Sequence, residues 1–95
     1  MLKVVAVNFP DPKNYDKILN YFRELAELTR KENGCISYCA CRDESHPKFL
    51  TMIEEWESRY ALDLHLKSEH FSRIVPKLSA LMVKEAEMNI YKQII

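Results

Sequence analysis

An amphipathic segment between two strand-like stretches constrains the fold more than any other feature of the chain. Apolar side chains recur at helical spacing from Tyr15 to Thr29, and charged side chains occupy the opposite side. This period predicts a helix that buries one face. The preceding stretch, Leu2–Phe9, is β-branched and apolar at both parities, which predicts a strand covered on both sides. Asp11 or Asn14 is expected to cap the start of the helix.

Gly34 is the only glycine of the chain. Helices often end with a residue in the left-handed conformation, usually glycine, at the C′ position. Gly34 follows the predicted helix, so we expect it at that position. A single glycine also excludes the glycine-rich loop that cradles phosphate groups in nucleotide-binding proteins.

Two more predicted strands, two short helices and a last strand follow Gly34. Ser58 and Ser68 suit the N-cap positions of the helices, and Pro76 should kink or divide the second one. In chain order these elements are strands over Cys35–Arg42 and Lys48–Trp56, helices that begin at Arg59 and after Ser68, and a half-exposed strand within Lys84–Ile95.

The order β-α-β-β-α-α-β predicts a ferredoxin-like sandwich of the α+β class, formed by one domain over residues 1–95. The expected sheet order is 4-1-3-2, with the first and third strands adjacent and parallel. Helices on one side would leave the other face of the sheet open. Because 47% of the residues are hydrophobic, we expect that face to meet a second subunit in a homodimer.

Charge and hydropathy argue against several classes of partner. Lys plus Arg and Asp plus Glu both number 14 and are interspersed, so no basic stripe is available for nucleic acid. The chain shows neither a long apolar run nor a basic amphipathic helix for membrane binding, and "MLKVVAVNFPDP" lacks the apolar core of a signal peptide. We therefore expect a cytoplasmic protein that binds neither nucleic acid nor membranes.

Three cysteines, Cys35, Cys39 and Cys41, share strand parity and are expected on one face of their strand. Their odd number and their spacing match neither a disulfide framework nor a zinc knuckle. Buried, reduced cysteines are the simpler interpretation, and a thiolate metal site or a redox role is the alternative.

Two segments, "ENGCISY" (Glu32–Tyr38) and "EEWESRYALDLHLKSEHF" (Glu54–Phe71), stand in the same order and at similar separations as motifs of a known family. With them the chain resembles the antibiotic biosynthesis monooxygenase (ABM) domain, a dimeric α/β barrel. The resemblance implies two subunits with their sheets face to face and one pocket per subunit between sheet and helices. Several members of the family oxidise quinols, anthrones or related aromatics with O2 and use neither metal nor flavin.

The same resemblance implies two other activities. One relative isomerises a phosphorylated diketone, which here would need a cationic cluster from Arg42, Lys48 and Arg59. Another relative degrades haem with an asparagine on the first strand and a histidine ligand on the last long helix. Asn8 would correspond to that asparagine, but Val75 stands at the ligand position and cannot bind iron.

Glu54 and Trp56 share the parity of Leu50 and Met52, so this row faces one side of its strand. If the row lines the pocket, Trp56 offers a flat wall for an aromatic substrate. Glu54 would then be a buried carboxyl group with a raised pKa, suited to general acid/base catalysis. The structural alternatives are an ordinary core position for Trp56 and, for Glu54, a partnership with an arginine or a backbone amide.

His65 and His70 are the candidate histidines of the second motif. In one continuous helix about 140° of rotation would separate them, so they are not expected to chelate one ion. A break at Ser68 would alter this geometry without creating a metal motif, so no metal site is predicted. His65 follows Ala61 by one turn and should point toward the pocket, where an imidazole can accept a phenolic proton. The alternative is a structural histidine that bridges helix and strand. His70 is a candidate for substrate binding, although the Ser68-x-His70 pattern also suits a helix start.

Asn8, Tyr38 and Phe71 complete the candidate substrate-binding residues. Asn8 ends a strand among apolar neighbours, so its amide needs partners, either a ligand carbonyl or the groups of a turn. Tyr38 offers a hydroxyl group, as Tyr15 and Tyr91 do, and Phe71 closes the second motif.

The leading hypothesis is a cofactor-independent monooxygenase that acts on a quinol-like or phenolic molecule and O2. His65, or a water molecule that it positions, would remove a phenolic proton, and an apolar pocket would hold the resulting radical pair. The competing hypotheses are a non-catalytic ligand-binding or dimerisation module and the isomerase. The sequence does not name the substrate.

Overall fold

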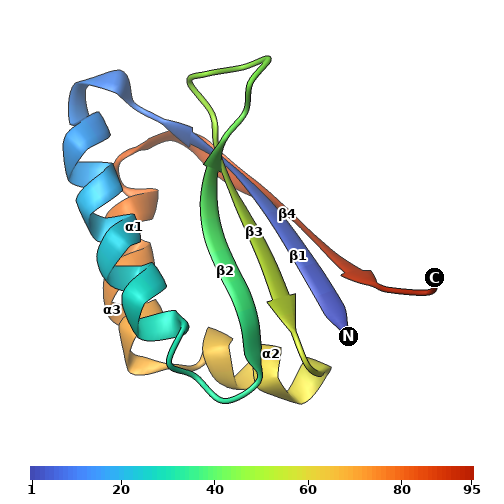
Figure 1. Ribbon diagram of the computed structural model, residues 1–95. Helices are drawn as coiled ribbons and strands as arrows, with labels where there is room; N and C mark the ends of the chain where they lie inside the picture. The colour runs from blue at the N-terminus through green and yellow to red at the C-terminus, as the bar shows by residue number, and fades with distance from the viewer.

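Four strands form one sheet, and the helices α1 and α3 lie together on one side of it, while α2 lies at one end (Figure 1). This arrangement confirms the predicted α+β, ferredoxin-like order. The computed structural model describes residues 1–95. Its elements are β1 (Leu2–Pro10), a short 3-10 helix η1 (Pro12–Asn14), α1 (Tyr15–Thr29), β2 (Cys35–Arg42), β3 (Leu50–Trp56), α2 (Arg59–Leu66), α3 (Glu69–Ser79) and β4 (Met82–Lys92).

The sheet has the order β2-β3-β1-β4, which is the predicted order of strands. The prediction that the first and third strands run parallel is wrong, because β1 pairs with β3 antiparallel. The crossover through α1 gives β1 and β2 the same direction, and β3 returns through a hairpin to lie between them. A strand in that position must oppose both neighbours, and β4 also pairs antiparallel with β1.

The serine caps are where the sequence predicts them. Ser58 Oγ accepts the backbone N–H of Ala61 at 3.1 Å, and Ser68 Oγ accepts that of Phe71 at 3.3 Å. Pro76 lies inside α3, but the helix continues to Ser79, so the proline does not divide it. The Pro76 carbonyl still accepts a bond from Ala80 N–H at 3.2 Å, because proline lacks only the donor of the pair.

The start of α1 and the position of Gly34 differ from expectation. Asp11 caps the short helix η1 rather than α1, and Asn14 makes no side-chain cap bond. Helix α1 ends at Thr29, so Gly34 is not its C′ residue but part of the turn that leads into β2. It does have the expected positive φ, 85°.

The turn at Gly34 packs tightly against α2. A Cβ atom at this position would lie 2.5 Å from Cβ of Ala61, closer than side chains approach one another. The Gly34 carbonyl also accepts the backbone N–H of Glu57 at 2.8 Å. Glycine is therefore required here by both the backbone conformation and the available space.

The core lies between the sheet and the helices on its covered face. Along β3 the side chains of Leu50, Met52, Glu54 and Trp56 point into it, which confirms their predicted common orientation. On the other face Ile53 is 45% exposed, so β1 and β3 are covered by helices on one side only. None of the helices has both the length and the apolar composition that crossing a membrane requires.

The three cysteines do not share one face, contrary to the parity argument. A register shift between Cys35 and Ser37 places Cys35 opposite Trp56, on the covered side of the sheet. Cys39 and Cys41 lie opposite Ile53 and Thr51, on the open side. All three are free thiols, and burial raises the pKa of Cys35 to about 11.

Gly34→Ala is expected to lower the free energy of unfolding by about 2–4 kcal/mol, because the new Cβ adds left-handed strain and an overpacked contact. Urea denaturation measures the change. Asn33→Ala, on an exposed neighbour in the same turn, should cost less than about 0.5 kcal/mol. Equal stabilities of the two variants would contradict the assigned role of Gly34.

Candidate functional site

A cavity of about 600 Å³ lies between the covered face of the sheet and the helices α1 and α3. Sixteen residues line it and 11 of these are hydrophobic, so a ligand would be held mostly by apolar contacts. Four of the sequence-predicted site residues are on its wall: Asn8, Tyr38, Glu54 and Phe71. Trp56, His65 and His70 are not.

Glu54 is the buried carboxyl group of the cavity wall. Its side chain projects from the middle of β3, and the residue is only 6% exposed. Burial raises the pKa of Glu54 to about 7, although the hydrogen bond from Trp56 Nε1 to Glu54 Oε1, at 2.9 Å, opposes the shift. A carboxyl group with this pKa can both take up and release a proton near neutral pH.

Tyr38 stands beside Glu54 on the same face, because the two residues are paired across β2 and β3. Burial raises the pKa of Tyr38, and the nearby Glu54 raises it further. The phenol therefore stays protonated at physiological pH. It can act as a hydrogen-bond donor in the cavity but not as a base.

Asn8 presents an oriented amide to the cavity. Its Nδ2 atom donates to the backbone carbonyl groups of Ala6, at 3.3 Å, and Leu50, at 3.2 Å. Both donor positions of the amide are thus engaged within the sheet. The amide oxygen is the group that a ligand can use, and it accepts hydrogen bonds.

Trp56 and His65 form a layer behind Glu54. Trp56 is completely buried, which agrees with its interpretation as a core residue, and its indole N–H holds the Glu54 carboxyl group. The His65 ring lies 4.7 Å from the Trp56 ring, measured between centroids. Burial lowers the pKa of His65, while its hydrogen bond to Glu32 opposes this shift.

The two histidines meet at Glu32, a residue that sequence reasoning did not select. The same carboxylate oxygen, Oε2, lies 2.7 Å from Nδ1 of His65 and 2.8 Å from Nε2 of His70. The rotation of about 140° that one continuous helix would place between them does not apply here. The chain breaks between α2 and α3, and Ser68 starts a new helix that turns His70 toward the same point.

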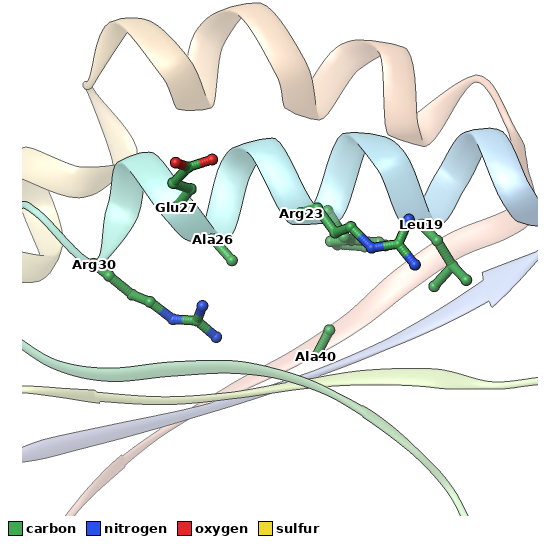
Figure 2. A pocket seen from close by; sticks show the side chains of 7 residues that line it. Leu19, Arg23, Ala26, Glu27, Arg30 and Ala40 are labelled. Atoms are coloured by element: carbon green, nitrogen blue, oxygen red, sulfur yellow. The ribbon is translucent and has the colours of Figure 1, made fainter.

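A second hollow, of about 440 Å³, lies between α1 and the edge strand β2 (Figure 2). Its two arginines are bound to neighbours: Arg30 Nε donates to the Tyr38 carbonyl at 3.0 Å, and Arg23 Nη1 to Asn20 Oδ1 at 2.7 Å. None of the sequence-predicted site residues lines it. The candidate reaction site is therefore the cavity beside Glu54.

The sequence profile described as "Antibiotic biosynthesis monooxygenase" (ABM) matches residues 1–77 of the chain. The protein belongs to the ABM family. A solved structure called antibiotic biosynthesis monooxygenase is 38% identical, with each chain covered completely and a TM-score of 0.93. A conserved protein from Methanosarcina mazei Go1 is 41% identical over 97% of this chain and 91% of its own, with a TM-score of 0.95.

Curated relatives of this ABM-family chain are longer. The protein sll1783 of Synechocystis sp. is 37% identical over 92 residues, which cover 94% of this chain and 61% of that protein. YjcS of Bacillus subtilis is 33% identical over 58 residues, 61% of this chain and 55% of its own. The matched regions span little more than half of the length of these two relatives.

The two ABM-like motifs come together in space. Tyr38 of the first lies opposite Glu54 of the second across two strands, and Glu32 of the first holds both histidines of the second. Val75 lines the cavity with an apolar side chain.

Glu54 should make the stability of the protein depend on pH. Its pKa of about 7 in the folded chain exceeds the ordinary value of 4.5. Between these two pKa values the folded state therefore binds more protons than the unfolded state. The contribution of Glu54 to stability is lost as pH rises through this range. The free energy of unfolding of Glu54→Gln, relative to that of wild type, should therefore increase by up to about 3 kcal/mol between about pH 4 and about pH 8.

Urea denaturation of both proteins at the two pH values measures this gain. Glu55→Gln is the matched control, because Glu55 lies on the opposite face of β3 and pairs with Lys3 at 3.0 Å. The control should show no gain with rising pH. If the difference in free energy of unfolding between wild type and Glu54→Gln did not change with pH, Glu54 would titrate as an ordinary carboxyl group.

Proposed function

We propose that this ABM-family protein is a monooxygenase that oxidises a quinol-like or phenolic small molecule with O2 and needs no cofactor. The observation that carries the proposal is Glu54, a buried carboxyl group with a pKa of about 7 on the wall of a mainly apolar cavity. A general base near the ambient pH is suited to remove a phenolic proton. We assign this role to Glu54.

The groups around the cavity fit a substrate with two hydroxyl groups. Glu54 accepts a proton from one hydroxyl group, and the oxygen of the Asn8 amide accepts a hydrogen bond from the other. The Tyr38 hydroxyl group donates a bond to the oxygen that becomes negative. Phe71 and the other apolar side chains contact the ring and exclude water.

The overall change for a hydroquinone is hydroquinone plus O2 to hydroxyquinone plus water. Glu54 takes the phenolic proton, and the phenolate passes one electron to O2, which leaves a phenoxyl radical and superoxide. These combine to form a C–O bond, and the Glu54 carboxylic acid protonates the outer oxygen of the new peroxide. Loss of the ring C–H proton then breaks the O–O bond and releases water.

Trp56 and His65 have positioning roles in this proposal. The Trp56 N–H binds one oxygen of Glu54, which leaves the other oxygen free for the substrate. His65 packs against the indole ring and keeps it in place. His65 supports the base from behind the cavity wall and is not itself the base.

A monooxygenase is better supported than an isomerase or a non-catalytic module. Arg42, Lys48 and Arg59, the cations that a phosphate group would need, are not on the cavity wall. Lys84 is on the wall, but its ammonium group lies over the Phe9 ring at 4.1 Å. The volume of about 600 Å³ leaves room for a small aromatic molecule.

Oxygen uptake with a panel of small hydroquinones, in chelator-treated buffer, tests the proposal. We expect uptake above a blank of heat-denatured protein. Glu54→Gln should lower kcat/KM at least about 100-fold, because it removes the proton acceptor. Glu55→Gln, the neighbour on the opposite face, should retain the wild-type rate. Absence of uptake for the whole panel, or full activity of Glu54→Gln, would overturn the proposal.

We also propose that two copies pair through the open face of the sheet. Ile53 and Tyr91, 45% and 51% exposed, stand on that face together with half-buried Val5 and Val7. Burial of such apolar area is the main favourable contribution to association. The helices α1 and α3 lie on the other side of the sheet and do not cover these side chains (Figure 1).

Ile53→Glu should convert the dimer into a monomer at micromolar concentrations, because it buries a charge at the centre of the interface. Size-exclusion chromatography with light scattering measures the mass. Tyr60→Glu is the control, since Tyr60 is 72% exposed on α2, away from the sheet. A wild-type protein that is already monomeric would refute the pairing.

A further inference from the structure

Glu32, His65 and His70 bring three metal-binding atoms to one place. The carboxylate oxygen of Glu32 and one ring nitrogen from each histidine all lie within 4.8 Å of one another. The three residues come from different segments: the turn before β2, the helix α2 and the start of α3. They lie outside the set of residues that line the cavity.

Two of the three separations between these atoms are close to those around a bound zinc ion. With Zn–N and Zn–O distances of about 2.0–2.2 Å, ligand atoms in a tetrahedral site are about 3.3 Å apart. The carboxylate oxygen is now 2.7 and 2.8 Å from the two nitrogen atoms. An increase of roughly 0.5 Å in each of these two separations would bring them to the spacing of a tetrahedral site.

The charges of the cluster also favour a cation. Glu32 is half-buried, and its ion-pair partners are the two histidines, which are charged only when protonated. His65 is 2% exposed. A divalent ion at this point would place positive charge directly beside the Glu32 carboxylate, and the neutral form of imidazole is the one that binds metal.

Access to the cluster comes from the side of His70 and Glu32, whose side chains are 15% and 16% exposed. Two imidazoles and one carboxylate form a donor set that suits Zn²⁺ and other divalent transition metals. Three protein ligands leave a fourth position for water.

We propose that Glu32, His65 and His70 form a site for a divalent transition metal ion of the Zn²⁺ class. The ion would fasten the turn before β2 to both short helices and so stabilise the wall behind Trp56. This site is separate from the cavity, and the inference does not depend on the proposed oxidation. Its test measures metal binding rather than activity.

The experiment uses the full chain, stripped of metal with a chelator and dialysed. Calorimetric titration with Zn²⁺ should give one ion per chain. Free Zn²⁺ at about 100 times Kd should raise Tm by about 10–20 °C, because the ion binds only the folded chain. Co²⁺ should produce d–d absorption bands without a thiolate-to-cobalt charge-transfer band, since the ligands are nitrogen and oxygen.

Two ligand variants and two controls locate the site. His70→Gln and Glu32→Gln should each weaken Zn²⁺ binding at least about 100-fold, with circular dichroism to verify that they fold. His46→Gln removes an exposed histidine of the β2–β3 loop, and Cys39→Ser removes a thiol on the open face. Both controls should bind Zn²⁺ like wild type.

Three results would overturn the proposal. The first is that the wild-type chain does not bind one Zn²⁺ ion. The second is that both ligand variants fold and keep the wild-type Kd for Zn²⁺. The third is that Zn²⁺ binding is lost in His46→Gln or Cys39→Ser. If one ligand variant fails to fold, the other ligand variant and the Co²⁺ spectrum of wild type still decide the outcome.

Discussion

The packing of α1 and α3 against one face of the sheet determines where the polar groups of the site can lie. A strand alternates its side chains between two faces, so only the residues on the covered parity of β3 can reach the core. Leu50, Met52 and Trp56 fill that row with apolar groups. Glu54 occupies the remaining position of the row and is therefore buried whether or not its charge is favourable there.

Burial of Glu54 is a cost that the rest of the fold has to offset. An ionised carboxyl group in an apolar wall loses hydration, and one hydrogen bond from Trp56 replaces only part of it. The apolar core around the cavity supplies the compensating free energy. Such a trade is common where a protein keeps a reactive group at the expense of stability.

Much of the fold followed from local patterns in the sequence. The helical spacing of Tyr15–Thr29, the serines at positions 58 and 68, and the alternation along β3 each depend on neighbouring residues only. The same alternation predicted that Glu54 and Trp56 face one way. That alternation could not decide which of the two reaches the cavity, and Trp56, unlike Glu54, is not on its wall.

Other features depend on contacts between distant segments, and sequence patterns did not contain them. Glu32 lies within the quoted motif "ENGCISY", but only the tertiary fold shows that it meets His65 and His70, 33 and 38 residues away. The bulge at Cys35 reverses the parity of one residue, and no local signal marks it. The prediction that β1 and β3 run parallel was wrong, because the hairpin that connects β2 to β3 decides the direction of β3.

The two hydrogen bonds of the Asn8 amide to strand carbonyl groups have a consequence for recognition. A free asparagine side chain loses rotational entropy when a ligand fixes it, and this loss weakens binding. Here the sheet has already fixed the rotamer, through the backbone of both β1 and β3. A molecule that enters the cavity therefore meets a preorganised acceptor, and affinity at this end of the site is governed by shape and direction rather than by induced ordering.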